Sequence, residues 1–228
     1  MKRIVFLIMV GAVTFNAWAA LSTITGSLST PSNEGLISGG ITWSEDEEGL
    51  TVFWEVSRLE DDTWHYQYTF TNGDGNPLKM LVSYFIISVS DNLTYSDVFS
   101  FGGDVEKYEL KTFGSGPSAP GFPEDQTIWG LKIELGGDQL TAEFSSKRAP
   151  MWGDFYAKDG GNPKNYAYNR DLGVKVSNPH DCQNAPIDEY GNSLFKVLVP
   201  DTVPEPAPEP ASLSMLALGS LLLIKRRA

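Results

Sequence analysis

Cysteine and histidine are scarce in this chain of 228 residues. Cys182 is the single cysteine, which excludes a disulfide within the chain and a structural zinc site built on cysteines. The two histidines are His65 and His180, and no Gly-x-Ser-x-Gly sequence marks a nucleophilic serine. The folded part must therefore be stabilised by its apolar core alone, and it is long enough to form one.

Positive charge is also in short supply, with 17 Lys and Arg residues against 29 Asp and Glu residues and a formal net charge of −12. Such a charge disfavours binding to nucleic acids, which attract basic proteins. A glycosidase, which uses a pair of carboxylates, is the enzymatic alternative. Asp and Glu are so abundant here that their presence alone does not identify such a pair. We predict no enzymatic activity, no catalytic residue and no cofactor.

Calcium is the inorganic ion that the sequence suits best, because it binds about six to eight oxygen atoms. Asn72, Asp74 and Asn76 alternate in one glycine-bearing turn, and Asp159 and Asn162 lie in another. Neither turn has EF-hand spacing, and Asn-Gly and Asp-Gly are ordinary hairpin turns, which is the interpretation that we favour. We therefore predict no metal site, with Ca²⁺ as the alternative.

Long apolar runs are missing as well, since no segment has the roughly 20 apolar residues that span a bilayer as a helix. Residues 1–19 instead combine two cations, a shorter apolar run and small residues at Ala17 and Ala19. These are the three parts of a secretory signal peptide with its cleavage site. We predict that this segment is removed on export; a short N-terminal membrane anchor is the alternative.

The C-terminal end carries a second short apolar run, 211–224, whose 14 uncharged residues would be about 21 Å long as a helix. Lys225, Arg226 and Arg227 follow it directly, and such cations stay on the cytoplasmic side of a membrane. The segment before it has proline at every second position from 204 to 210, which favours an extended spacer. Both ends therefore predict that the body lies on the outer side of the membrane.

The tail, residues 203–228, resembles the PEP-CTERM sorting domain, in which a Pro-Glu-Pro motif precedes a short apolar helix and a terminal basic cluster. The motif occurs at 204–206 and again at Pro208, Glu209 and Pro210, and the second copy has the usual spacing to the helix. The resemblance implies processing by an exosortase, a membrane protease-transpeptidase of Gram-negative bacteria that make extracellular polysaccharide. An uncut C-terminal membrane anchor is the alternative.

The body, residues 20–202, has mostly the period-two pattern of strands. Apolar and polar side chains alternate, as in strands with one buried face, over 64–70, 129–135 and 140–144. The segments 50–57 and 78–90 are more continuously apolar, as in central strands, and glycine-bearing turns separate the segments. Roughly nine to eleven short strands without an amphipathic helix predict an all-β domain, an antiparallel β-sandwich or jelly roll.

Two segments of the body lack this pattern. Residues 22–35 are polar, and we expect them to be a loose lead-in to the first strand. Residues 113–123 are rich in glycine and proline, and we expect a long surface loop there.

Aromatic residues gather in a segment rich in glycine and asparagine, which contains Trp152, Tyr156, Tyr166 and Tyr168. Exposed rings of this kind stack on sugars, so these four residues are a candidate carbohydrate-binding platform. The alternative is that they fill the core between the sheets, as large aromatic side chains usually do.

The sequence as a whole predicts an exported, non-enzymatic protein of the cell surface or the extracellular matrix. Its expected partners are the membrane, an exosortase-like enzyme and extracellular polysaccharide, and its expected route is transient residence in the inner membrane followed by release to the surface or the medium. Removal of both ends would take away five cations and lower the formal net charge from −12 to −17. A carbohydrate-binding module for that polysaccharide is the alternative function.

Overall fold

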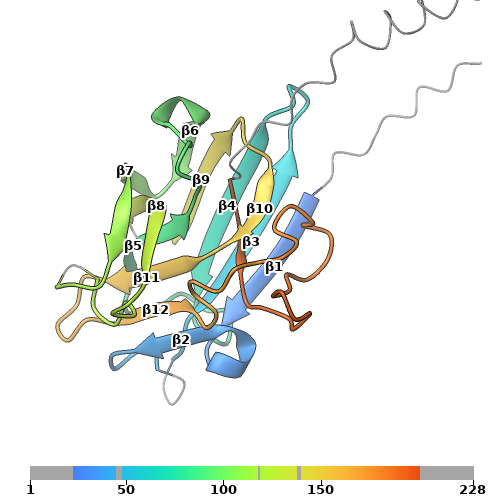
Figure 1. Cartoon of the computed structure of the whole chain (residues 1–228). Coiled ribbons are helices and arrows are strands. Elements are labelled where there is room, and N and C mark those ends of the chain that lie inside the picture. The colour runs from blue at the N-terminus through green and yellow to red at the C-terminus, as the bar shows by residue number, and fades with distance from the viewer. Residues whose placement is uncertain (1–22, 45–47, 118, 138–139, 201–228) are drawn as a thin grey trace, which may run out of the picture.

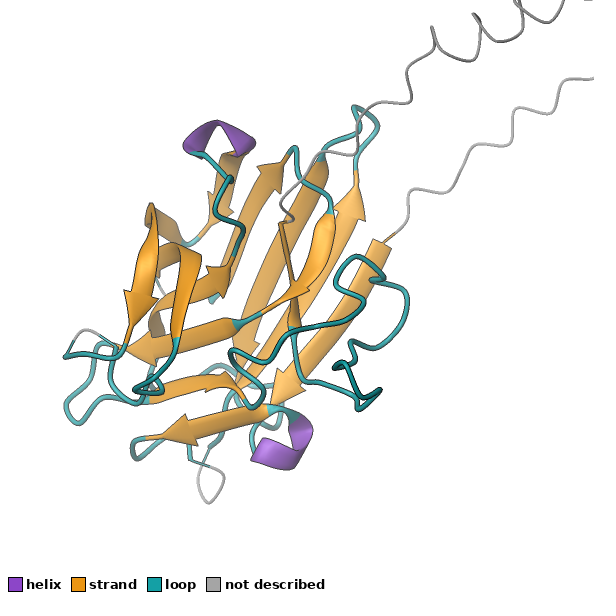
Figure 2. Cartoon of the chain, in the orientation of Figure 1, coloured by secondary structure: helices purple, strands orange, loops and turns teal. Residues whose placement is uncertain are grey.

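The computed structural model describes residues 23–44, 48–117, 119–137 and 140–200. Within them the chain forms strands joined by turns and loops, together with two short helical turns (Figures 1 and 2). The elements are β1 (Thr23–Ser29), η1 (Ser32–Glu34), β2 (Leu36–Gly39), β3 (Thr51–Arg58), β4 (Trp64–Thr71), β5 (Val82–Ser88), η2 (Tyr95–Asp97), β6 (Val98–Gly103), β7 (Val105–Gly114), β8 (Thr127–Leu135), β9 (Thr141–Ser146), β10 (Pro150–Gly153), β11 (Phe155–Asp159), β12 (Tyr166–Asn169) and β13 (Val197–Pro200). The predicted all-β class is confirmed.

Two antiparallel sheets make up most of the fold (Figure 1). One has five strands in the order β1-β3-β4-β9-β6, and the other has six in the order β2-β12-β11-β5-β8-β7. β10 and β13 form a separate antiparallel pair, and β13 contacts β1, β3 and β5. The chain crosses from one sheet to the other repeatedly, for example between β4 and β5 and between β8 and β9.

Aromatic rings from the two sheets meet in a common core. Tyr68 and Phe70 of β4 lie against Phe85 of β5, with ring centroids 5.3 and 5.1 Å apart, and Phe70 also stacks on Phe155 of β11 at 6.1 Å. All four side chains are buried. Because the burial of such rings is a large apolar contribution to stability, this layer holds the sheets together.

The predicted strand faces are confirmed. In β4 the side chains of Tyr66, Tyr68 and Phe70 are buried while the residues between them lie toward the outside. Leu131 and Ile133 of β8 are buried in the same way, and so are the alternate apolar residues of β9. The period-two pattern therefore identified which face of each strand packs inward.

The two segments expected to be central strands are indeed paired on both sides. β3 lies between β1 and β4, and β5 lies between β11 and β8. They differ in burial, because β5 is buried on both faces whereas β3 alternates and leaves Phe53 exposed. The outer face of β5 is covered by part of the segment between β7 and β8.

The sequence predicted a long surface loop at 113–123, but the segment between β7 and β8 is partly buried. Ala119 and Phe122 are buried against the outer face of the six-stranded sheet, where Phe122 and Tyr156 have ring centroids 5.3 Å apart. They form a second, smaller hydrophobic cluster with Ile86 and Ile128. This loop therefore covers part of the outer face.

Two further expectations about local structure are wrong. Residues 23–29, expected to be a loose lead-in, form β1, which pairs along its whole length with β3. The described residues contain thirteen strands rather than nine to eleven. Four of them, β2, β10, β12 and β13, have four residues each, and a segment that short shows too few alternations to be recognised in a sequence.

The predicted signal peptide (1–19) and sorting tail (203–228), with the motif at Pro208, Glu209 and Pro210, lie outside the described residues. Across the part of the chain that is described, no helix has the length and apolar character needed to cross a membrane.

Candidate functional site

The outer face of the six-stranded sheet carries an ordered group of tyrosines and lysines. The strand register places Tyr166 of β12, Lys158 of β11 and Tyr84 of β5 side by side in one row. The next row continues from Tyr168 through Tyr156 and Ile86 to Lys132 of β8. We call Tyr84, Lys132, Lys158, Tyr166 and Tyr168 the tyrosine–lysine face.

Three of the four predicted platform residues lie on this side of the sheet, but one of them is unavailable. Tyr156 is fully buried beneath the loop that follows β7, and its hydroxyl donates a hydrogen bond to Pro120 O at 2.9 Å. Tyr166 and Tyr168 are partly buried at the edge of the same cluster. For Tyr156 the expectation of an exposed stacking surface is therefore wrong, because the loop covers its ring.

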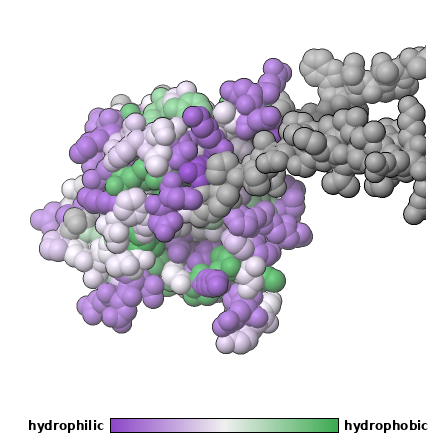
Figure 3. Space-filling model, turned by 45° about the horizontal axis from the view of Figure 1, so that its top comes forward, coloured by the Kyte–Doolittle hydropathy of each residue, from purple (hydrophilic) through white to green (hydrophobic). Residues whose placement is uncertain are grey.

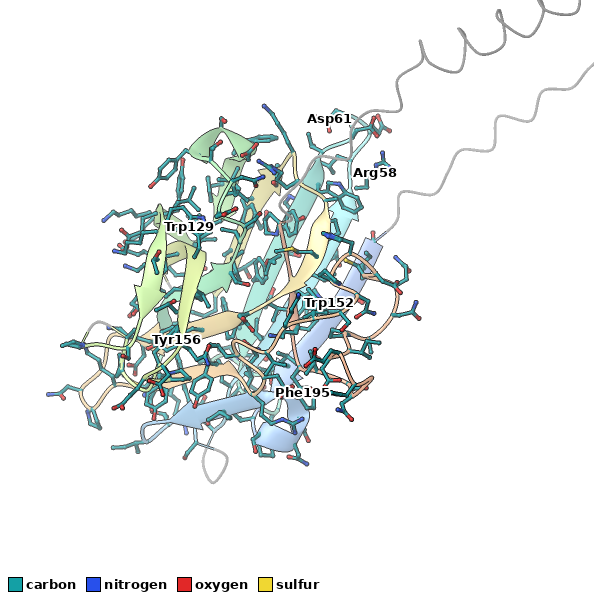
Figure 4. The ribbon with its side chains drawn as sticks, viewed as in Figure 1. Arg58, Asp61, Trp129, Trp152, Tyr156 and Phe195 are labelled. Atoms are coloured by element: carbon teal, nitrogen blue, oxygen red, sulfur yellow. The ribbon has the colours of Figure 1, made fainter. Side chains whose placement is uncertain are left out.

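Trp152 belongs to a different part of the fold (Figure 4). It lies on β10 and packs edge-on against Trp54, with ring centroids 6.4 Å apart. Its indole N–H donates to the carbonyls of Asp181 and Asn184, each at 3.1 Å. The four predicted residues consequently do not form a single row, and only Tyr166 and Tyr168 remain as partly accessible rings near each other.

Two ammonium groups lie against the ring of Tyr84. Lys132 Nζ is 4.5 Å and Lys158 Nζ is 5.1 Å from its centroid, distances at which a cation is attracted to an aromatic face. Burial raises the pKa of Tyr84 to about 12, so the phenol stays neutral in neutral solution. The residues that make this arrangement come from β5, β8 and β11, which only the fold brings together.

Like charges are concentrated at one end of this face. Burial and the neighbouring ammonium of Lys164 lower the pKa of Lys158, and the charge of Lys132 acts in the same direction. Lys132 is offset by Glu134 at 2.6 Å and by Glu109 at 3.4 Å. An anionic group placed near Lys158 and Lys164 would relieve their mutual repulsion, which is a property of binding sites for anions.

A surface hollow borders the tyrosine–lysine face. It has a volume of about 810 Å³ and is lined by Ser115, Gly116, Ala119, Gly121, Phe122, Pro123, Glu124 and Asp125. Gly121 has φ +71°, and a side chain there would collide with the ring of Tyr166. The glycine therefore allows the loop to lie directly on Tyr166, so that the hollow and the partly exposed ring are neighbours.

The two histidines lie in different parts of the fold. His65 lies on the outer side of β4, and its Nε2 is 3.9 Å from Glu143 Oε2. Cys182 is buried, with its Sγ 3.1 Å from Pro150 O, and His180 lies in the exposed loop before it.

Two of the side chains considered as Ca²⁺ ligands, Asn72 and Asp159, accept hydrogen bonds within the chain. Asn72 Oδ1 accepts from the backbone N–H groups of Asp74 and Asn76, which makes this segment a hydrogen-bonded turn. It joins β4 and β5, which lie in different sheets, so the expected β-hairpin is wrong here. Both carboxylate oxygens of the buried Asp159 accept hydrogen bonds from Asn165. Over the described ranges, no group of three or more His, Cys, Asp or Glu side chains gathers in a way that could hold a metal ion.

On the face seen in Figure 3, hydrophobic residues of the described part are scattered among hydrophilic ones. The large hydrophobic side chains that are exposed come from separate places, among them Ile41, Phe53, Tyr95 and Tyr190. The tyrosine–lysine face with its hollow is therefore the arrangement best suited to a ligand. Comparisons with protein families, with curated proteins and with solved structures find no match to this chain.

Proposed function

We propose that this protein is an exported, non-enzymatic component of an extracellular matrix and that its tyrosine–lysine face contacts a polysaccharide carrying carboxylate groups. The observation that carries the proposal is the pair of ammonium groups against the Tyr84 ring, with Lys164 beside Lys158. An acidic sugar offers both an anionic group for the lysines and a flat apolar ring face for a tyrosine. A plain carbohydrate-binding module, the second candidate, would use the same face.

The geometry favours an extended polymer over a small ligand. The partly accessible side chains of the tyrosine–lysine face come from β12, β11 and β8, whereas Tyr84 of β5 is buried between them. Because neighbouring strands are about 4.8 Å apart, contacts spread over these strands suit more than one sugar unit. The protein is strongly acidic overall, so a negatively charged polymer is repelled at long range and attracted only where the lysines lie. Binding is therefore expected to be confined to this face and to weaken with salt.

The two chain ends support the location in this proposal. The signal peptide at 1–19 directs export, and the tail at 203–228 resembles an exosortase substrate, which links the protein to bacteria that make extracellular polysaccharide. In this scheme the apolar run 211–224 holds the chain in the inner membrane until the exosortase acts near Pro208, Glu209 and Pro210. The body is the part that reaches the matrix, as a β-sandwich of the jelly-roll kind.

Replacing Lys158 and Lys164 together with glutamine is expected to reduce retention on immobilised polygalacturonate about tenfold, because the two charges that face the carboxylates are lost. Retention on dextran, which has no charge, is expected to be unaffected. Affinity chromatography of the full chain at two salt concentrations measures both effects.

The matched control is the double replacement of Lys79 and Lys175 with glutamine. Both side chains are exposed and neither is one of the residues of the tyrosine–lysine face, and the change in net charge is the same. Equal losses of retention in the two double variants would show that the polymer responds only to overall charge, and the proposed site would then be wrong.

A further inference from the structure

The side chains of Lys196, Asp154 and Asn169 meet beside the start of β13, the end of β10 and the end of β12. Lys196 directly precedes β13, Asn169 is the last residue of β12 and Asp154 lies between β10 and β11. The side chain of Lys196 is 1% exposed and that of Asp154 13%, while Asn169 is fully buried. Figure 4 labels Phe195, the residue directly before Lys196, and so marks where this group lies in the fold. The polysaccharide contact does not use any of these three residues.

A single carboxylate oxygen joins the three side chains. Asp154 Oδ1 accepts a hydrogen bond from Lys196 Nζ at 2.6 Å and another from Asn169 Nδ2 at 3.0 Å. Because both nitrogens bond the same oxygen, the distance from Lys196 Nζ to Asn169 Nδ2 cannot exceed the sum of these two hydrogen-bond lengths. The carbonyl oxygen of the same amide, Asn169 Oδ1, accepts a hydrogen bond from the backbone N–H of Phe155 at 2.7 Å.

We propose that Lys196 and Asn169 are joined by an intramolecular isopeptide bond, with Asp154 as the proton carrier. These groups supply each requirement for attack on an amide. The amine is held near the electrophile, a carboxylate contacts both, and a backbone N–H is aimed at the oxygen that becomes negative. This inference is independent of the polysaccharide proposal.

The reaction balances without any added reactant. In the first step one proton of the Lys196 ammonium passes to Asp154 along the hydrogen bond that joins them. The neutral Nζ then attacks Cγ of Asn169 and forms the new C–N bond, while the Phe155 N–H stabilises the oxyanion. Asp154 delivers this proton to Nδ2 and then takes the second proton from Nζ. The old C–N bond breaks, ammonia leaves, and Asp154 ends as the neutral acid.

The bond would have a structural consequence for an exported protein. It would tie the start of β13, the final strand before the tail, to the end of β12 in the six-stranded sheet. The single cysteine cannot form a disulfide within the chain, so this is a covalent cross-link that the sequence still permits. A force applied to the chain after β13 would then act on a covalent bond as well as on the hydrogen bonds of β13.

Mass spectrometry of the tryptic digest of the purified full chain tests the proposal. The bond predicts that trypsin does not cleave after Lys196 and that the peptide containing it is joined to 165–170, with the loss of one ammonia. Recovery of 165–170 as a linear peptide, together with cleavage after Lys196, would overturn it. A join to 149–158 with loss of water would show that Asp154 is the acylating group and would overturn the assignment of Asn169.

Three variants separate the roles. Lys196→Arg keeps a cation but removes the amine nucleophile, and Asp154→Asn removes the proton carrier, so both are expected to abolish the ammonia loss. Lys79→Arg, a change to an exposed lysine outside the group around Asp154, is expected to retain it. Full cross-linking in the Asp154→Asn variant would contradict the mechanism. Because the wild-type digest decides the main point, the proposal stays testable even if one of these variants does not fold.

Discussion

Replacement of Tyr156 with alanine is expected to lower the free energy of unfolding by about 3–5 kcal/mol, the usual effect of removing a large buried aromatic side chain. The ring is fully buried between Phe122 of the covering loop and Tyr84 of β5, with centroid separations of 5.3 and 6.3 Å. Its removal takes away the surface on which the loop rests. Chemical denaturation followed by tryptophan fluorescence measures the change.

Two companion variants establish the reason for this loss. Tyr156→Phe removes only the hydrogen bond to Pro120 O and is expected to cost about 0.5–1.5 kcal/mol. Tyr190→Ala, at an 80% exposed tyrosine, is expected to change stability by less than about 0.5 kcal/mol. If Tyr156→Ala left stability unchanged but abolished binding to polygalacturonate, the ring would be a sugar platform and the covering loop would have to open.

Replacement of Asp97 with alanine is expected to cost about 3 kcal/mol, because it removes the carboxylate partner of a buried guanidinium. Asp97 Oδ2 accepts hydrogen bonds from Arg148 Nη2 at 3.0 Å and from the Thr94 backbone N–H at 2.8 Å. The exposed pair Arg58–Asp62, with side chains 50% and 80% exposed, is the matched control. Asp62→Ala is expected to cost less than about 1 kcal/mol, and equal losses in the two variants would contradict the role assigned to burial.

The same carboxylate makes stability depend on pH. Burial alone would raise the pKa of Asp97, but hydrogen bonds from Arg148 and Thr94 outweigh it and hold the pKa below its ordinary value of 3.8. A carboxyl group whose pKa is lower in the folded protein stabilises it above the unfolded pKa, and that contribution disappears as the pH falls through the folded pKa. The stability difference between wild type and Asp97→Ala is therefore expected to shrink below about pH 4, as urea titrations at pH 7, 5 and 3 would measure. A constant difference would contradict this assignment.

The sequence was sufficient to predict which side chains of the longer strands face inward. It was not sufficient to predict which segments cover the outer faces of those strands. Alternation in β4 and β8 shows which side chains point together, and these predictions are confirmed. The aromatic cluster predicted Tyr156 as an exposed ring, and no local pattern could indicate that Phe122 and its loop bury it. The period-two pattern shows which side chains of a strand share a face of its sheet. Whether another segment covers that face depends on contacts between residues far apart in the sequence.

The candidate site depends on strand pairing that no local pattern specifies. Lys132 and Lys158 meet at Tyr84 only because β5 is paired with β8 on one side and with β11 on the other. The buried group around Asp154 was missed for the same reason. One signal was present, since Lys196 interrupts an otherwise apolar segment that forms β13, and a charged residue in such a segment calls for a buried partner.

The most direct test of the proposed function is the intact mass of the protein recovered from its native host after separation of the inner membrane, the extracellular matrix and the medium. Export and sorting predict a chain that begins near Ala20, ends near Pro210 and is found in the matrix fraction. A chain that still ends in Lys225, Arg226, Arg227 and Ala228 and remains in the inner membrane would contradict the proposal, because the body would then never reach the polysaccharide.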